Sequence, residues 1–468
     1  MLSPGTFGGV KPSTRTWLVA ILIALAATGL VAAMFTFARP AAPPPPVDSA
    51  QLREAITQDA LVGHLNALQR IADANGGNRA AGTPGYAGSI DYVEGELRKA
   101  GYQTQRQQFS YTRPDFTKAS LRRTAPTQTD YVVGRDHRPL EFSGSGSVTA
   151  AVTAVDLKLD GDQTNTSACE ASDFANFPRG TIALVQRGTC QFNQKVEHAV
   201  AAGAGGVIVL NQGNGEGRRG LFTGTLGRSA NVPVVATTFD LGTEWARPGT
   251  TLALSVESTV ATISTENLIA DTAAGTNGRT FTLGAHLDSV SDGPGMNDNA
   301  SGVAAVLEIA VQFARLQPQQ TTRVRFVFWG GEEDGLLGSR HYVGQLGEAE
   351  RKSISGYLNL DMIGSPKPAP AVYGRIGWPA GSSTIQSLLT EALTSQGVTP
   401  GVTGMRSSDH APFLDAGIPV GGLFTGADDA TDPCYHQVCD RLQGLDRTML
   451  EKMADAAAHA TLSYAQAP

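Results

Sequence analysis

Short apolar segments that suit buried strands alternate with amphipathic helical segments over the C-terminal half of the chain. The predicted strands are Thr280–Ala285, Arg325–Trp329 and Tyr357–Leu360, and the predicted helices are Ser301–Leu316, Ile385–Gln396 and Met449–Tyr464. This alternation predicts an α/β fold with a largely parallel, mixed central sheet flanked by helices. Such sheets bind ligands in the crevice at the carboxyl ends of their strands.

Length and charge narrow the class of protein. The 468 residues, of which 41% are hydrophobic, suffice for two or three domains with buried cores. The formal net charge is -7 and no segment is strongly basic. Nucleic acid is therefore not expected as a partner.

The N-terminus carries an export signal. Residues 17–38 are uncharged and apolar, and as a helix they would span about 33 Å, enough for a bilayer core. Lys11 and Arg15 precede them, so the positive-inside rule predicts that the rest of the chain is periplasmic or extracellular. A proline-rich spacer, residues 40–46, follows. We expect residues 1–47 to be a membrane anchor and linker, with cleavage as a secretory signal as the alternative.

The remaining chain divides into three stretches. Residues 48–111 read as helices, including one predicted over Ser89–Ala100, but have no core partner of their own. Residues 112–262 contain short β-rich runs, and residues 263–468 contain the strand and helix alternation. We therefore expect the β-rich stretch to be a domain inserted into a larger one built from the two flanking stretches.

The four cysteines form two local pairs in the sequence. Cys169 lies near Cys190, and Cys434 lies near Cys439. Four cysteines allow three connectivities, and local pairing is the simplest of them. An exported chain favours disulfides over free thiols.

Potential metal ligands follow the predicted strands or lie in loops nearby. They are His286, Asp298, Glu333, Asp361 and His436. Imidazole and carboxylate groups suit zinc, but five ligands exceed the three protein ligands of an ordinary catalytic zinc. If Asp298 bridges two ions, each ion has three ligands, which predicts two Zn²⁺ per chain.

Three other polar residues lie next to these ligands in the sequence. Glu332 is a candidate general base that takes a proton from a water molecule activated by the metals. Asp288, two residues after His286, is a candidate for orienting that imidazole. Tyr435 is a candidate hydrogen-bond donor to a developing oxyanion.

At these residues the chain resembles the zinc aminopeptidases of metallopeptidase clan MH, of the secreted bacterial leucyl aminopeptidase and aminopeptidase Y type. The matching segments are GAHLDSV (284–290), GMNDNASG (295–302), WGGEEDGLLGS (329–339), NLDMIG (359–364), SSDHAPF (407–413), CYHQVCD (434–440) and, in the N-terminal part, GNRAAGTPGY (77–86). The resemblance implies the zinc-exopeptidase sandwich fold and removal of apolar residues from peptide N-termini.

The resemblance also implies specific roles. One zinc ion would be held by His286 and Asp361 and a second by Glu333 and His436, with Asp298 as the bridge. It implies Glu332 as base, Tyr435 as oxyanion donor and a disulfide between Cys434 and Cys439. Residues 183–212 and 231–242 further resemble a protease-associated (PA) domain, in which Cys169 and Cys190 would be paired.

The same residues are compatible with other functions. A carboxypeptidase or dipeptidase of the same clan would share the five ligands, and a carboxypeptidase would need a cation for the substrate carboxylate, for which Arg406 is a candidate. His410 is a second candidate substrate-binding residue. A glutaminyl cyclase of this fold has a related ligand set, and a receptor-like ectodomain without activity would be expected to lack ligands.

Overall fold

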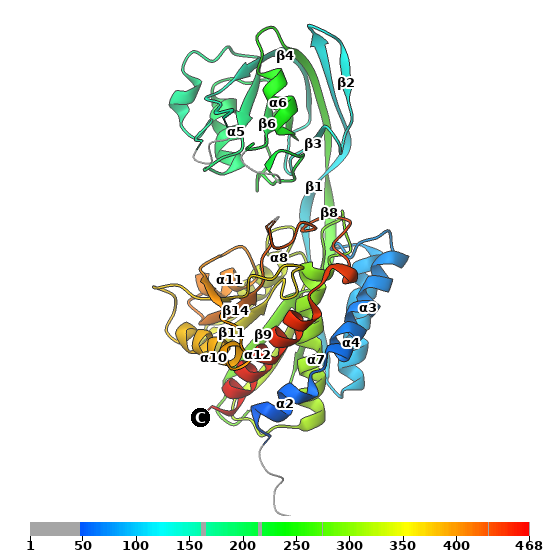
Figure 1. The fold of residues 1–468 in the computed structure, drawn as a ribbon, viewed down its shortest axis with the longest axis vertical. Helices are drawn as coiled ribbons and strands as arrows, with labels where there is room; N and C mark the ends of the chain where they lie inside the picture. Colours follow the sequence, from blue (N-terminus) through cyan, green and yellow to red (C-terminus); the bar gives the residue numbers. More distant parts are fainter. Residues whose placement is uncertain (1–46, 161–164, 214–217, 274, 429, 468) are drawn as a thin grey trace, which may run out of the picture. The chain divides into compact units, whose positions relative to one another are not determined.

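The structure is a computed structural model that describes residues 47–160, 165–213, 218–273, 275–428 and 430–467 (Figure 1). The predicted anchor, residues 17–38, lies outside these residues. Within the described ranges, no helix combines the length and apolar character that crossing a membrane requires.

A mixed, mostly parallel sheet forms the centre of the peptidase part. Its strand order is β13-β12-β14-β11-β9-β10-β8. The central neighbours β14, β11, β9 and β10 are parallel, whereas β12 runs antiparallel to β14 and β8 runs antiparallel to β10. The bounds are β8 Thr251–Asp271, β9 Thr280–His286, β10 Arg323–Trp329, β11 Ile354–Leu360, β12 Ala371–Tyr373, β13 Gly401–Thr403 and β14 Val420–Phe424. The predicted α/β fold is confirmed.

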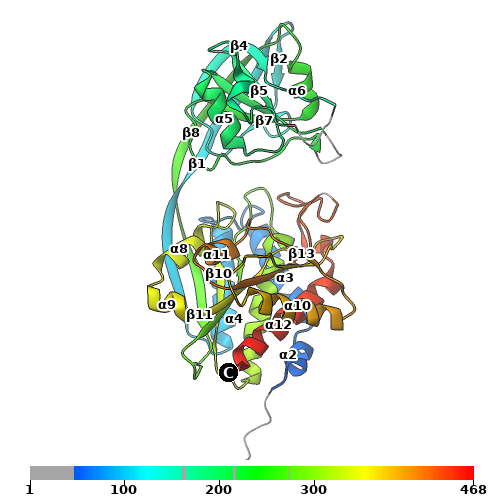
Figure 2. The same ribbon diagram turned by 90° about the vertical axis from the view of Figure 1, so that its left-hand side faces the viewer.

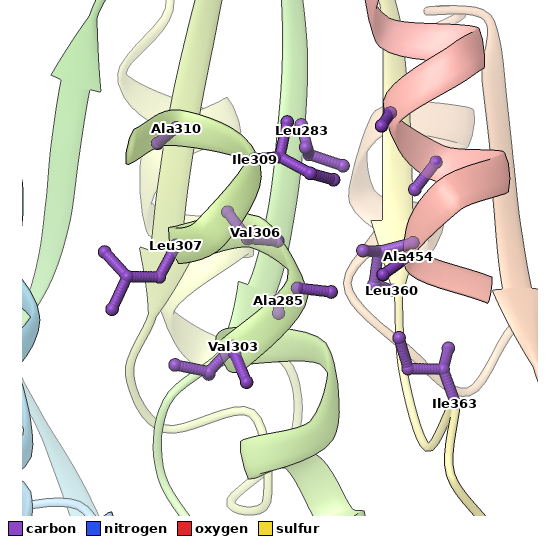
Figure 3. Packing of buried hydrophobic residues seen from close by; sticks show 14 of the residues in the cluster. Leu283, Ala285, Val303, Val306, Leu307, Ile309, Ala310, Leu360, Ile363 and Ala454 are labelled. Atoms are coloured by element: carbon purple, nitrogen blue, oxygen red, sulfur yellow. The ribbon is translucent and has the colours of Figure 1, made fainter. Parts of the chain in front are cut away.

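Alternating side chains of the central strands enter two different apolar layers. In β10, Phe326 and Phe328 join the larger layer, whereas Val327 and Trp329 join the smaller one. The pleat of a strand directs successive side chains to opposite faces, so both faces of this sheet must be covered. Figure 3 shows the larger layer, where Leu283 of β9 and Leu360 of β11 lie among residues of the covering helices.

Helices cover both faces, which gives the sandwich (Figures 1 and 2). The helices that contribute to the larger layer are α2 Ser49–Ala55, α3 Gln58–Ala74, α4 Pro84–Lys99, α7 Ser301–Leu316, α10 Ser382–Ser395 and α12 Arg447–Gln466. The smaller layer receives residues from α8 Leu337–Gln345 and α11 His410–Asp415, and the short helix α9 Glu348–Ser353 precedes β11. Because α2, α3 and α4 share one core with α7 and α12, the N-terminal stretch completes the peptidase domain.

The inserted domain has its own small sheet, in the order β4-β5-β6-β7-β3. Helix α5 contributes to the apolar layer on one face and α6 to the layer on the other. The bounds are β3 His137–Pro139, β4 Gly146–Ala154, β5 Ile182–Gln186, α5 Phe192–Ala201, β6 Gly206–Leu210, β7 Val234–Thr237 and α6 Phe239–Trp245. The predicted inserted domain is therefore present, with a core separate from that of the peptidase domain.

Two long antiparallel strands connect the domains. β1, Thr104–Ala125, pairs with β8 over almost its whole length, and the short strand β2, Thr129–Tyr131, pairs with the end of β1. β8 also pairs with β4 at its start and with β10 at its end, so one strand belongs to both sheets. The boundaries expected at residues 112 and 262 fall inside these two strands.

Both cysteine pairs are disulfides, Cys169–Cys190 and Cys434–Cys439. The first closes a segment of the inserted domain with a sequence separation of 21.

Removing a crosslink of that length costs about 3 kcal/mol in the chain-entropy account of disulfide stabilisation. We expect the double variant Cys169→Ser/Cys190→Ser to unfold at lower urea concentration, followed by circular dichroism, with unchanged metal content. An unchanged urea midpoint would contradict this expectation.

Candidate metal centre

Three neighbouring parallel strands end at the same edge of the sheet and deliver the acidic and imidazole groups there. β9 ends in His286, Glu332 and Glu333 follow β10, and Asp361 follows β11 directly. β9 lies between β10 and β11, and all three run parallel. The carboxyl ends of the strands therefore converge, as the sequence pattern predicted.

Asp298 lies between the two imidazoles and turns one oxygen toward each. Its Oδ1 is 3.2 Å from Nε2 of His286, and its Oδ2 is 3.1 Å from Nε2 of His436. Asp361 Oδ1 is 3.4 Å from His286 Nε2, and Glu333 Oε2 is 3.1 Å from His436 Nε2. The ligand atoms thus form two groups, each within 4.8 Å, that share Asp298.

The Cys434–Cys439 disulfide closes the loop that carries His436. The backbone of His436 has a φ of 60°, in the left-handed region that non-glycine residues seldom adopt. The ring of Tyr435 stacks on the imidazole with 3.8 Å between the centroids. The loop therefore presents a tyrosine and a histidine side by side at the centre.

Backbone and side-chain hydrogen bonds hold the turn that contains Asp298. Asp440, the last residue of the CYHQVCD segment, accepts hydrogen bonds from the backbone N–H groups of Asn297 and Asp298, at 2.7 and 3.0 Å. Asn299 donates to the carbonyl of Leu360 and accepts from the backbone N–H of Met362. The turn that carries Asp298 is thereby fixed to the His436 loop on one side and to the Asp361 segment on the other.

Asp288 accepts hydrogen bonds through two different groups, its backbone carbonyl and its side-chain carboxylate. Nδ1–H of His286 donates to the backbone carbonyl of Asp288 at 3.1 Å, while the nearer carboxylate oxygen is 3.8 Å away. That carboxylate instead accepts hydrogen bonds from the backbone N–H groups of Glu332 and Glu333, at 3.2 and 3.3 Å. The sequence predicted that Asp288 orients His286; here the backbone supplies that hydrogen bond, and the side chain positions the Glu332–Glu333 segment.

A buried arginine that the sequence pattern did not predict as a site residue supports the loop between His286 and Asp298. Arg79 is fully buried and donates to the carbonyls of Leu287, Pro294 and Gly295. Burial lowers its pKa to about 10, against the attraction of nearby carboxylates. Its only sequence signal was its place in the GNRAAGTPGY segment.

The two candidate substrate-binding residues lie in different surroundings. Arg406 is exposed and its guanidinium pairs with Asp415. His410 is fully buried, with Nε2 at 2.8 Å from the carbonyl of Met405 and its ring beside those of Tyr373 and Trp378. Arg406 is thus already partnered, which does not favour the cationic pocket that a carboxypeptidase needs.

The centre contains more carboxylates than cationic side chains. Burial and this imbalance of charge shift the pKa values of its residues. Burial and the neighbouring charge of Asp298 raise the pKa of Glu333 to about 7. Burial opposes ionisation of Asp298 too, but hydrogen bonds with both histidines lower its pKa below the ordinary value. Although burial works against it, the charge of Glu333 and the hydrogen bond to Asp298 raise the pKa of His436 to about 11.

The residues fit bound divalent metal. Across the described ranges, Oε1 of Glu333 and Oδ1 of Asp361 are buried and lack a hydrogen-bond partner. Buried carboxylate oxygens of this kind are costly unless a cation or a donor compensates them. Two imidazoles and three carboxylates in two groups also match the nitrogen and oxygen ligands that zinc takes in proteins.

Comparison with known proteins identifies the family. Residues 267–461 match Peptidase family M28, and residues 148–245 match the PA domain. An aminopeptidase of Pseudomonas aeruginosa is 44% identical over 429 residues, which cover 86% of this chain and 80% of that protein. The chain belongs to peptidase family M28. The prediction of a metal-dependent aminopeptidase with an inserted PA domain is confirmed.

Two further relatives agree with this assignment. A probable lipoprotein aminopeptidase of Mycobacterium tuberculosis, LpqL, is 36% identical and covers 96% of this chain and 93% of its own length. The structure of an aminopeptidase from Aneurinibacillus sp. strain AM-1 superposes with a TM-score of 0.74 at 27% identity, covering 90% of this chain and 97% of that one. The two disulfides, together with the lipoprotein relative, indicate an extracytoplasmic protein.

Asp298→Ala tests the shared position of this carboxylate. Because Asp298 belongs to both ligand groups, we expect the variant to lose metal at both positions and to lose activity. Elemental analysis of the dialysed protein measures the metal content. Asp130→Ala, at an exposed carboxylate paired with Arg122, is the control and should keep its metal. Two metal equivalents retained by Asp298→Ala would contradict a shared role for Asp298 in metal binding.

Proposed function

We propose that this aminopeptidase holds two zinc ions and removes apolar residues from the N-termini of peptides. His286 and Asp361 would hold one ion, Glu333 and His436 the other, and Asp298 both. The observation that carries the proposal is the placement of the two Asp298 oxygens, each about 3 Å from a different imidazole. The preference for an apolar, leucine-like residue rests on the resemblance to leucyl aminopeptidases.

Zinc bound at these ligands would polarise the scissile carbonyl and lower the pKa of a water molecule. Glu332 is the base in this proposal. Its carboxylate is buried, with Oε2 3.9 Å from Nε2 of His286, and is in neither ligand group. Burial, reinforced by Asp409 and Asp361 and only partly offset by His286, raises its pKa well above the ordinary value. The role of base rests on position: a carboxylate beside the ligands but outside both groups can take a proton from water and pass it to the leaving amine.

Tyr435 is the donor to the oxyanion in this proposal. The side chain of Tyr435 is 36% exposed. Desolvation of its phenol, followed by the charges of Asp298, Glu333, Glu332 and Asp361, raises its pKa well above the ordinary value. The phenol therefore keeps its proton. It can donate a hydrogen bond to the substrate carbonyl oxygen as that oxygen gains negative charge.

The proposed location is the outer side of a membrane, with residues 17–38 as the anchor. The absence of charge over these residues and the basic residues before them support it. Peptides outside the cytoplasm would then be the substrates. If the segment is cleaved, the same domain would be secreted.

Glu332→Gln tests the base. The amide keeps the shape of the side chain but cannot take a proton, so we expect kcat to fall by about 10²–10⁴, the range typical of general acid–base groups. Metal content should stay at the wild-type level, because Glu332 belongs to neither ligand group. Steady-state kinetics and elemental analysis measure the two quantities. A variant with normal turnover would remove Glu332 from the mechanism.

Hydrolysis of leucine p-nitroanilide by the chain from Val47 onward tests the activity. We expect cleavage, loss of cleavage after treatment with a chelator, and recovery when zinc is added. N-acetylleucine p-nitroanilide is the matched control and should not be cleaved, because an aminopeptidase needs a free amine. Equal cleavage of the acetylated substrate would contradict the proposal.

A further inference from the structure

A chain of four hydrogen bonds runs from the interior of the peptidase domain to Asp361. Nε1–H of Trp329 donates to Oη of Tyr357 at 2.7 Å, and the Tyr357 hydroxyl donates to Oδ1 of Asn359 at 2.7 Å. Nδ2–H of Asn359 donates to Oγ of Ser408 at 2.7 Å, and the Ser408 hydroxyl donates to Oδ2 of Asp361 at 2.6 Å. We call these four bonds the Trp329 relay.

Both ends of the Trp329 relay fix its direction. An indole N–H can only donate, and a carboxylate oxygen can only accept. The Tyr357 hydroxyl accepts a hydrogen bond from Trp329, so it donates its own proton to Asn359. The amide of Asn359 therefore turns its oxygen toward Tyr357 and its NH₂ toward Ser408. Ser408 in turn accepts from Asn359, and its proton goes to Asp361.

The Trp329 relay is sealed from solvent. Trp329, Tyr357 and Ser408 are 0% exposed and Asn359 is 1% exposed. The ring of Tyr357 stacks on Phe413 at 4.1 Å between centroids and an interplanar angle of 8°. An asparagine in an apolar layer is costly unless its hydrogen bonds are made, and here both ends of its amide are bonded.

Gly284 makes room for the first link. Trp329 lies on β10 and Tyr357 on β11, and β9 runs between them. A Cβ at Gly284 of β9 would lie 2.9 Å from Nε1 of Trp329 and 2.9 Å from Oη of Tyr357. Any side chain at this position would push into the hydrogen bond between them. The glycine therefore lets the Trp329 relay cross the central strand.

The two carboxylate oxygens of Asp361 differ in their hydrogen bonding. Oδ2 accepts from Ser408, whereas Oδ1 has no hydrogen bond to any described residue and lies 3.4 Å from the imidazole of His286. We propose that Trp329, Tyr357 and Asn359 are positioning residues that act through Ser408 to hold Oδ2 of Asp361, so that Asp361 binds metal through Oδ1 alone. The inference rests on the proposed zinc centre.

Tyr357→Phe tests the Trp329 relay, because it removes one oxygen atom and breaks two links. Groups that support a metal ligand in this way change metal affinity by about 10–100-fold when removed, and we expect about 10-fold weaker zinc binding at one of the two positions. Competition with a chelator of known zinc affinity measures this without reference to activity. Gly284→Ala should also weaken binding, because the added methyl displaces the same link.

The matched control is Tyr342→Phe. Tyr342 is also buried and packs against Trp329, but its hydroxyl accepts from Arg325 and is outside the Trp329 relay. This variant should keep wild-type zinc affinity. Ser408→Ala should weaken binding more than Tyr357→Phe, and Ser408→Thr, which keeps the hydroxyl, should restore it.

Cobalt substitution gives a second readout. If Asp361 binds through both oxygens once the Trp329 relay is broken, the coordination number of Co²⁺ rises and its visible absorption weakens. We expect that change in Tyr357→Phe and not in Tyr342→Phe. Wild-type zinc affinity and an unchanged cobalt spectrum in folded Tyr357→Phe and Gly284→Ala would overturn the relay alone. Failure of the wild-type chain to bind zinc would overturn the zinc centre and the relay with it.

Discussion

The peptidase domain depends on holding several buried carboxylates together against their mutual repulsion. Two like charges 4 Å apart cost about 4 kcal/mol even at the effective dielectric typical of protein sites, and burial adds a desolvation penalty for each. The two histidines and the buried Arg79 offset only part of this charge. The buried acidic residues at or near the centre are Asp288, Asp298, Glu332, Asp361, Asp409 and Asp440, and the partly buried Glu333 lies beside them.

The way these carboxylates are held keeps the centre attractive to metal ions. Asp288 and Asp440 accept from backbone N–H groups, and Asp361 accepts from the hydroxyl of Ser408. None of these donors is charged. Lysine or arginine partners would have fixed the same oxygens but would have cancelled the negative charge. Neutral donors fix the geometry and leave the negative charge available to bound metal, while Arg79 directs its guanidinium to carbonyls instead.

The sequence predicted most of the fold because the central strands and helices are strongly apolar and periodic. β9, β10 and α7 lie where the pattern placed them, and the polar residues after each strand converge because parallel neighbours end at one edge. The long pairing of β1 with β8 was not predicted. β1 carries several arginines and Pro114, and both strands are partly exposed, so they lack the apolar pattern of a buried strand.

The supporting contacts of the site escaped prediction for a different reason. Asp440 and Ser408 stood inside recognised segments, but an acidic or hydroxyl residue in a loop has no periodicity that identifies its partner. Trp329 and Tyr357 read simply as apolar strand residues, and the hydrogen bond between them crosses a strand that is distant from both in sequence. Only the strand order brings these residues together.

The pleat of β11 finally links the core to the site. Leu358 and Leu360 enter the larger apolar layer, whereas Tyr357 and Asn359 lie on the other face, and Asp361 continues the same alternation. A one-residue change of register would exchange the two sets of side chains. The larger layer can tolerate substitution by other apolar residues of similar volume. Substitution of Tyr357 or Asn359 on the other face would instead break the hydrogen bonds that lead through Ser408 to Asp361, a candidate metal ligand.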